Sequence, residues 1–259
     1  MKRIVSAAIL IPLIAWDVVW APQWVFLGIL AIIGSLAYYE FDSIAARHSV
    51  SRRGWPGGPW TGMAAGLILL FSPEPVIATL AVVWIVLMLL ALRLDDLAGA
   101  LPTAAAAMLG ALYIFGAWRC AILLRELNPH WLLVALLVSW AGDTAALYIG
   151  RAFGKRKMSP IISPSKTWEG AAGSLAGGII VALLYTYFLI PQVPVWAVIL
   201  LGGAGNIAGQ AGDLAESALK RGANMKDSGT MIPGHGGWLD RIDSSLFSIP
   251  TVYVLLRML

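Results

Sequence analysis

Charged side chains are scarce in this sequence. They account for 12% of its 259 residues, whereas hydrophobic residues account for 59% and the mean hydropathy is +0.79. An ordinary soluble domain carries about 25% charged residues, so this composition excludes a soluble globular enzyme. It also excludes a disordered chain, because disorder requires low hydrophobicity. Cysteine is scarcer still: Cys120 stands alone, which excludes an internal disulfide.

Long apolar segments dominate what the sequence does contain. A helix needs about 20 apolar residues to cross roughly 30 Å of hydrocarbon. The alternative for the first such segment is a cleaved signal peptide, since Lys2 and Arg3 precede it. The many later segments favour a membrane helix instead. We expect an all-α, polytopic membrane bundle forming a single domain over 1–259, with N-terminal spans in 1–98 and the polar motifs in 99–259. The nine predicted spans are 4–20, 24–40, 57–72, 75–93, 99–124, 131–149, 170–190, 194–216 and 243–258.

The basic residues predict the orientation of these spans. If the loops alternate from an inside N-terminus, 15 of the 18 Lys and Arg residues lie inside. Such a bias is typical of cytosolic loops, so the N-terminus is expected in the cytosol. The weakest span, 57–72, is kept as a crossing because its loss would turn the later basic loops outward. The net charge of +4 then indicates attraction to phosphate or anionic lipid rather than binding of nucleic acid.

A polar stripe enters the membrane along the eighth span. Its members recur at steps of four and three residues, which places them on one helix face. Asp213 lies 17 residues beyond Trp196, or about 25 Å along a helix, near the cytosolic edge. Charged groups in a span predict function, although a polar contact between helices is the alternative. The stripe comprises Asn206, Gln210, Asp213, Ser217 and Lys220, beside the small residues Gly202, Gly205, Gly209 and Gly212.

Two further carboxylates lie in or near spans. Asp143 falls about 12 Å inside the cytosolic edge of the sixth span, where a buried carboxylate needs a cation, a metal or a proton. A structural pair with a basic residue such as Arg119 is the alternative. Glu40, at the end of the second span, is a weaker candidate because a carboxylate at a helix end can face water.

Two cytosolic segments carry the remaining polar chemistry. In the first, Ser165, Lys166 and Thr167 precede an apolar helix, and hydroxyls beside a lysine at a helix start predict a phosphate cradle. A basic loop that contacts anionic lipid headgroups is the alternative. In the second, Asp213 and Asp240 bracket a glycine-rich basic loop. Oxygen ligands of this kind suit Mg²⁺ shared with substrate phosphates.

The second segment resembles the defining motif of the phosphatidate cytidylyltransferase family, also called CDP-diacylglycerol synthases. That motif reads Ser-x-x-Lys-Arg, four residues, Lys-Asp-x-Gly or Ser, then Pro-Gly-His-Gly-Gly, two residues and Asp-Arg-x-Asp. The stretches 163–170 and 142–154 resemble two further parts of the family, and Arg3 and Glu40-Phe41 match it faintly. The motif positions are filled by Ser217, Lys220, Arg221, Lys226, Asp227, Pro233, Gly234, His235, Gly236, Gly237, Asp240, Arg241 and Asp243.

The resemblance implies that CTP and phosphatidate give CDP-diacylglycerol and pyrophosphate, in a homodimer. The compact length favours a bacterial inner membrane, and the basic loops predict a site that faces the cytosol. The resemblance implies Asp213 and Asp240 as magnesium ligands, with Asp143 and Asp227 as second candidates, and it leaves a second metal ion open. It also implies phosphate or nucleotide contacts from Ser165, Lys166, Thr167, Ser217, Lys220, Arg221, Lys226, His235 and Arg241. A CTP-dependent lipid kinase, a synthase acting on archaeal ether lipids and a membrane transporter stay open as alternatives.

Overall fold

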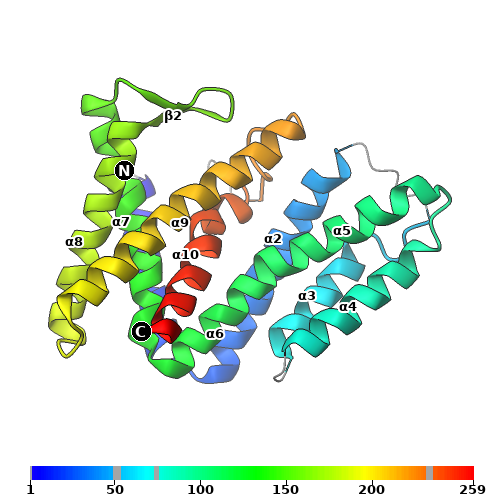
Figure 1. Cartoon of the computed structure of the whole chain (residues 1–259), viewed down its shortest axis with the longest axis horizontal. Coiled ribbons are helices and arrows are strands. Elements are labelled where there is room, and N and C mark those ends of the chain that lie inside the picture. Colours follow the sequence, from blue (N-terminus) through cyan, green and yellow to red (C-terminus); the bar gives the residue numbers. More distant parts are fainter. Residues whose placement is uncertain (1, 49–53, 73–75, 232–235) are drawn as a thin grey trace. The chain divides into compact units, whose positions relative to one another are not determined.

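The computed structural model describes residues 2–48, 54–72, 76–231 and 236–259. It is helical apart from one short hairpin (Figure 1). The predicted motif residue His235 lies outside the described residues, as do the basic residues Arg52 and Arg53. The elements, in chain order, are α1 Lys2–Val19, α2 Gln23–Ala46, α3 Pro59–Phe71, α4 Val76–Ala91, the 3₁₀ turn η1 Leu97–Gly99, α5 Ala100–Gly110, the π-helical turn η2 Ala111–Gly116, α6 Ala117–Leu127, α7 Pro129–Phe153, β1 Lys157–Ser159, β2 Ser163–Thr167, α8 Trp168–Leu189, α9 Val195–Gly222 and α10 Leu239–Met258.

The protein is an all-α polytopic membrane protein, as predicted. Within the described parts of the chain, five helical stretches are long and apolar enough to cross a bilayer: α2, the continuous run Leu97–Leu127, α7, α8 and α9. Shorter apolar helices occupy Leu10–Val19, α3 and α4. Every predicted span therefore coincides with a helix or a run of helices, α10 included. The number that cross the membrane stays a prediction.

The chain divides into two compact units. The first unit comprises Met1–Leu30, Cys120–Gln210 and Phe247–Leu259. The second comprises Ala31–Arg119 and Ala211–Leu246. The boundary cuts through four helices, α2, α6, α9 and α10. The single domain over 1–259 stays a prediction.

In the first unit, α7 and α8 lie side by side and carry the hairpin at their adjoining ends (Figure 1). Pro129 stands in the first turn of α7, where its missing N–H is harmless, and Asn128 caps this helix by accepting a hydrogen bond from His130 N at 3.0 Å. Small residues allow the close packing: a Cβ on Gly173 would lie 2.5 Å from Ile149. In the antiparallel hairpin, Lys157 pairs with Thr167 and Ser159 with Ser163.

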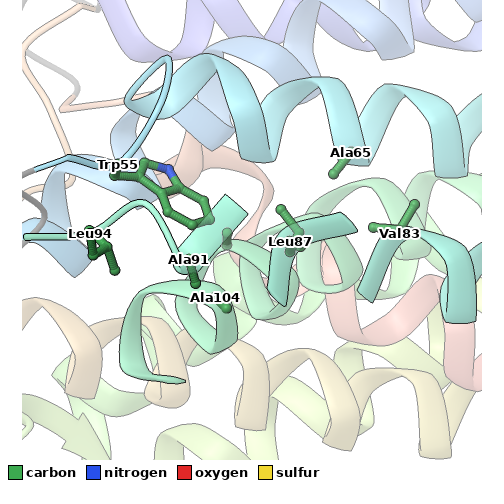
Figure 2. Packing of buried hydrophobic residues seen from close by; sticks show 8 residues of the cluster. Trp55, Ala65, Val83, Leu87, Ala91, Leu94 and Ala104 are labelled. Atoms are coloured by element: carbon green, nitrogen blue, oxygen red, sulfur yellow. The ribbon is translucent and has the colours of Figure 1, made fainter. Parts of the chain in front are cut away.

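The core of the second unit lies between α3, α4 and α5. Figure 2 shows Leu87 and Val83 of α4 beside Ala65 of α3 and Ala104 of α5, with Trp55 closing one end. Alanine and glycine at the facing positions let these helices approach closely, which replaces hydrophobic burial as a source of stability within a membrane.

The second half of α2 is fixed to the same unit by aromatic side chains. The Tyr38 ring lies 6.1 Å from the Phe115 ring of η2, and the Phe41 ring lies 6.1 Å from that of Tyr113. Glycines face these rings, since a Cβ on Gly110 would approach Phe41 to 2.6 Å. Glu40, between Tyr38 and Phe41, is therefore carried on a rigid segment.

Candidate active site

The polar stripe of α9 separates into two parts with different roles. In the first unit, Asn206 Nδ2 donates to Val138 O at 3.0 Å and to Ser174 Oγ at 3.1 Å. Gln210 Nε2 donates to Asn206 Oδ1 at 2.7 Å and to Ala171 O at 3.3 Å. These bonds tie α9 to α7 and α8. For Asn206 and Gln210 the structure shows the contact between helices that was the alternative interpretation.

The small residues of α9 also pack within the chain. A Cβ on Gly202 would lie 3.0 Å from the Cβ of Ala182, and one on Gly205 would lie 2.9 Å from Val252. These positions therefore serve close contacts with α8 and α10 inside the first unit.

The charged part of the stripe belongs to the second unit. Asp213, Glu216, Ser217 and Lys220 follow at steps of three or four residues along α9, so they share a face. Ser217 Oγ lies 3.4 Å from Asp213 Oδ1. The buried Lys220 ammonium forms an ion pair with Glu216 and lies 2.5 Å from Asp240 Oδ1. A lysine thus joins carboxylates from α9 and from the start of α10.

Asp240 is held by more than this lysine. Its Oδ2 accepts hydrogen bonds from Gly237 N at 2.8 Å, Ser228 N at 2.9 Å and Ser228 Oγ at 3.0 Å. Burial acts to raise the pKa of this carboxyl, but the hydrogen bonds from Lys220, Gly237 and Ser228 outweigh it and leave the pKa lowered. Asp240 is therefore ionised at neutral pH and fixed in orientation.

Glu40, the weaker candidate, lies at the same junction, and the alternative that it faces water is wrong. Its side chain is buried, with the residue only 2% exposed. Oε1 accepts from Trp238 N at 3.1 Å, and Oε2 accepts from Leu239 N at 2.9 Å and from Ser228 Oγ at 2.7 Å. The first amides of a helix lack partners inside the helix, and Glu40 supplies them at the start of α10.

Three glycines make room for these two carboxylates. Gly236 has a φ of +78°, and a Cβ there would lie 2.5 Å from Asp240 Oδ2. A Cβ on Gly229 would lie 2.6 Å from Glu40 Oε1, and one on Gly237 would collide with Ser228 and Glu40. The glycines of the motif thus allow close packing around fixed carboxylates.

The other basic motif residues flank this junction in the sequence, but their side chains are not buried. Arg221, Lys226 and Arg241 are exposed, and Arg221 Nη1 donates to Met225 O at 3.2 Å. The acidic Asp227 is also exposed. Exposed cations of this kind are accessible to a phosphate.

The first cytosolic segment belongs to the other unit. Ser165 is exposed and Lys166 half-buried on β2. Thr167 is buried, and its Oγ1 accepts a hydrogen bond from Gly170 N at 3.1 Å, so it is the N-cap of α8. Glu169 closes the hairpin by accepting from Lys155 N at 3.1 Å and Arg156 N at 3.2 Å.

Asp143 differs from its prediction in one respect. It lies on α7 of the first unit, and the residue is exposed rather than buried. On a predicted membrane span an exposed carboxylate can still border hydrocarbon, so its need for a cation, a metal or a proton stays a prediction. Its proposed role now depends on the family resemblance.

Metal binding has partial support in the side chains present. No group of three or more His, Cys, Asp and Glu side chains suited to a metal ion occurs within the described ranges. Glu216 is completely buried, however, and its Oε1 has no hydrogen-bond partner. A buried carboxylate oxygen of this kind fits a cation, and Mg²⁺ commonly uses one or two carboxylates together with substrate phosphates.

Two residues of the junction, Glu216 and Ser228, were missed by sequence reasoning, and Glu40 was ranked only as a weaker candidate. Glu216 could have been found, because it lies three residues beyond Asp213 and four before Lys220. Ser228 sits inside the recognised motif without a distinguishing neighbour. Glu40 contacts residues nearly two hundred positions away, and no local pattern signals that.

Comparison with known proteins places the whole chain in one family. Residues 1–259 match the family model described as "Cytidylyltransferase family". Proteins named phosphatidate cytidylyltransferase are similar to part of the chain. The relative from Staphylococcus haemolyticus is 44% identical over 132 residues, which is 51% of each protein. That from Bacillus subtilis is 40% identical over 153 residues, which is 58% of this chain and 57% of the relative. The matched part thus spans about half the length of these curated relatives.

Proposed function

The chain belongs to the cytidylyltransferase family, and from this premise we propose that it transfers the cytidylyl group of CTP to phosphatidate, giving CDP-diacylglycerol and pyrophosphate. The names of the partly matching relatives support this substrate pair. The motif residues quoted above support it independently of those names.

One observation carries the proposal: the Lys220 ammonium lies between Glu216 of α9 and Asp240 at the start of α10. This junction brings fixed carboxylates together with a cation, and exposed basic residues flank it in sequence. Two crowded phosphate anions require such alternation of charge when they react.

The reaction requires mainly that the two substrates are aligned. An oxygen of the phosphatidate phosphate attacks the α-phosphorus of CTP, a P–O bond forms, and the bond to pyrophosphate breaks in line with it. A phosphomonoester has a second pKa near ~6, so its oxygen is already ionised at neutral pH and a strong general base is unnecessary. Binding both anions in reacting geometry is therefore the main task of the protein.

The chain's basic residues are suited to that task. Lys166, Arg221, Lys226 and Arg241 would contact the triphosphate or the lipid phosphate, with Ser165, Ser217 and His235 as further contacts. Asp227 and Asp143 stay second candidates for the catalytic carboxylates. Thr167 would contribute by fixing the start of α8 beside Lys166, since its hydroxyl already caps that helix.

We propose that Asp213 and Asp240 hold Mg²⁺, which commonly uses one or two protein carboxylates together with substrate phosphates. The ion pair of Lys220 with Glu216 and Asp240 supports the assignment of Asp240, because it indicates that positive charge is favoured beside that carboxylate. When bound, the ion would neutralise charge that develops on the transferred phosphoryl group. A second metal ion is part of the same proposal.

The side of the membrane on which the site lies, the membrane itself and the oligomeric state are also proposals. The distribution of basic residues supports an N-terminus and a site on the cytosolic side, and the bacterial relatives support a bacterial inner membrane. A homodimer is the oligomeric state that the family resemblance favours.

Product analysis of the purified protein tests the proposed function. The protein is incubated with CTP, phosphatidate and Mg²⁺, and lipid and nucleotide products are separated. A liponucleotide with an equal amount of pyrophosphate is expected. Release of CDP with a phosphorylated lipid would indicate a CTP-dependent kinase, and substrate movement across vesicles without any product would indicate a transporter.

A further inference from the structure

We infer that Glu40 is a positioning residue: it holds Ser228 and the first turn of α10 so that Asp240 faces Lys220. For its activity readout this inference rests on the proposed function. The structural part of it stands on contacts within the second unit alone.

The hydrogen bonds of Glu40 all converge on one short region. Trp238 N, Leu239 N and Ser228 Oγ donate to its two oxygens at 3.1, 2.9 and 2.7 Å. An ionised carboxylate is the group that accepts three such bonds, and bonds to a charged acceptor are stronger than those to a neutral one. Glu40 thereby fixes the residues immediately before Asp240 in the chain.

Ser228 connects Glu40 directly to Asp240. Its Oγ lies 2.7 Å from Glu40 Oε2 and 3.0 Å from Asp240 Oδ2. A hydroxyl has one hydrogen, so the two carboxylates share it. Its backbone N–H also donates to Asp240, at 2.9 Å. A displacement of Ser228 therefore changes the environment of Asp240 at two atoms.

The surroundings of Glu40 leave little freedom to compensate for its loss. Tyr38 and Phe41 fix α2 on either side of it, and Gly229 and Gly237 approach its carboxylate closely. Glutamine at this position fits by size, but one end of its amide is a donor. That NH₂ group would face the N–H of either Trp238 or Leu239, so at least one bond is lost and replaced by repulsion.

The test compares Glu40→Gln with Glu126→Gln, a control at an exposed glutamate in the other unit. Hydrogen–deuterium exchange of the full chain is followed in peptides that contain the Trp238 and Leu239 amides. Steady-state kinetics with CTP and phosphatidate gives kcat and the CTP KM separately. In Glu40→Gln we expect exchange of these amides to rise, and kcat to fall, by about tenfold or more, the size typical of losing a hydrogen bond to a charged group.

A positioning role predicts that the CTP KM stays within about threefold of the wild-type value while kcat falls, because the basic residues that bind phosphate are left in place. Glu126→Gln should leave exchange, kcat and KM unchanged. Wild-type exchange at Trp238 and Leu239 in Glu40→Gln, or an unchanged kcat, overturns the inference.

Ser228→Ala replaces Glu40→Gln if the latter does not fold. It removes the shared hydroxyl and keeps the backbone bond to Asp240, so a smaller fall in kcat is expected, and an unchanged kcat overturns the inference. If the wild-type protein forms no liponucleotide, the proposed function fails, and the exchange comparison alone then decides the role of Glu40.

Discussion

The Lys220 ammonium lies 2.5 Å from Asp240 Oδ1, and this contact joins the end of one long helix to the start of another. Both residues belong to the recognised motif, and twenty positions separate them in the sequence. Glu216 completes the arrangement as the second partner of the lysine.

Replacement of Lys220 by methionine should destabilise the protein strongly. It leaves Glu216 and Asp240 buried without their cation, and breaking a buried pair in this way costs about 3–5 kcal/mol. Thermal unfolding in detergent should show a clearly lower Tm. The exposed Lys226→Met is the matched control, and its Tm should equal that of the wild type.

The double variant Lys220→Met, Glu216→Gln separates the charge effect from lost packing. It removes one of the two unpaired charges, so it should recover part of the Tm that the single variant loses. If the double variant unfolds at a lower temperature than Lys220→Met, the ion pair is not what stabilises this junction.

The close packing around the two carboxylates predicts that alanine has different effects on stability at two glycines. A Cβ on Gly237 collides with Ser228 and Glu40, whereas one on Gly28 meets no atom within 4 Å. Gly237→Ala should therefore lower stability by about 1–3 kcal/mol, the usual effect of overpacking. Gly28→Ala, within α2, should be neutral or slightly stabilising. Equal Tm values for the two variants would contradict the packing described for Gly237.

The cap on α8 predicts a different pattern at Thr167. Thr167→Ala removes the acceptor for Gly170 N and should cost about 1 kcal/mol of stability. Thr167→Ser keeps the hydroxyl and should retain most of that stability. Thermal unfolding of both variants checks this, and a loss as large in serine as in alanine would mean that the methyl group, not the cap, matters.

Much of the fold could be predicted from composition and hydropathy. Apolar segments of about the right length predicted a helix at each position, including the short α3, because membrane helices leave a strong local signal. The π-helical turn 111–116 and the closing contact of Glu169 with the hairpin were not predicted, since both depend on local geometry that apolar runs do not encode.

Part of the site could be predicted because its residues stand close together in the sequence. Lys220 and Asp240 stand in a dense motif, and the structure brings them together. Glu40 was ranked only as a weaker candidate because its partners, Trp238 and Leu239, are distant in sequence. The helix contact of Asn206 was only the alternative interpretation, because a polar residue on a membrane helix looks the same whether it binds a ligand or the carbonyl of Val138.

The central claim is that this chain transfers the cytidylyl group of CTP to a lipid phosphate with the help of Asp213 and Asp240. The most direct measurement uses CTP labelled separately at the α- and γ-phosphates, with wild-type protein and with Asp213→Asn and Asp240→Asn. We predict that the wild type places the α-label in lipid and the γ-label in pyrophosphate, and that both variants insert in the membrane but do neither. Lipid carrying the γ-label, or near-normal magnesium-dependent turnover in either variant, would contradict the account.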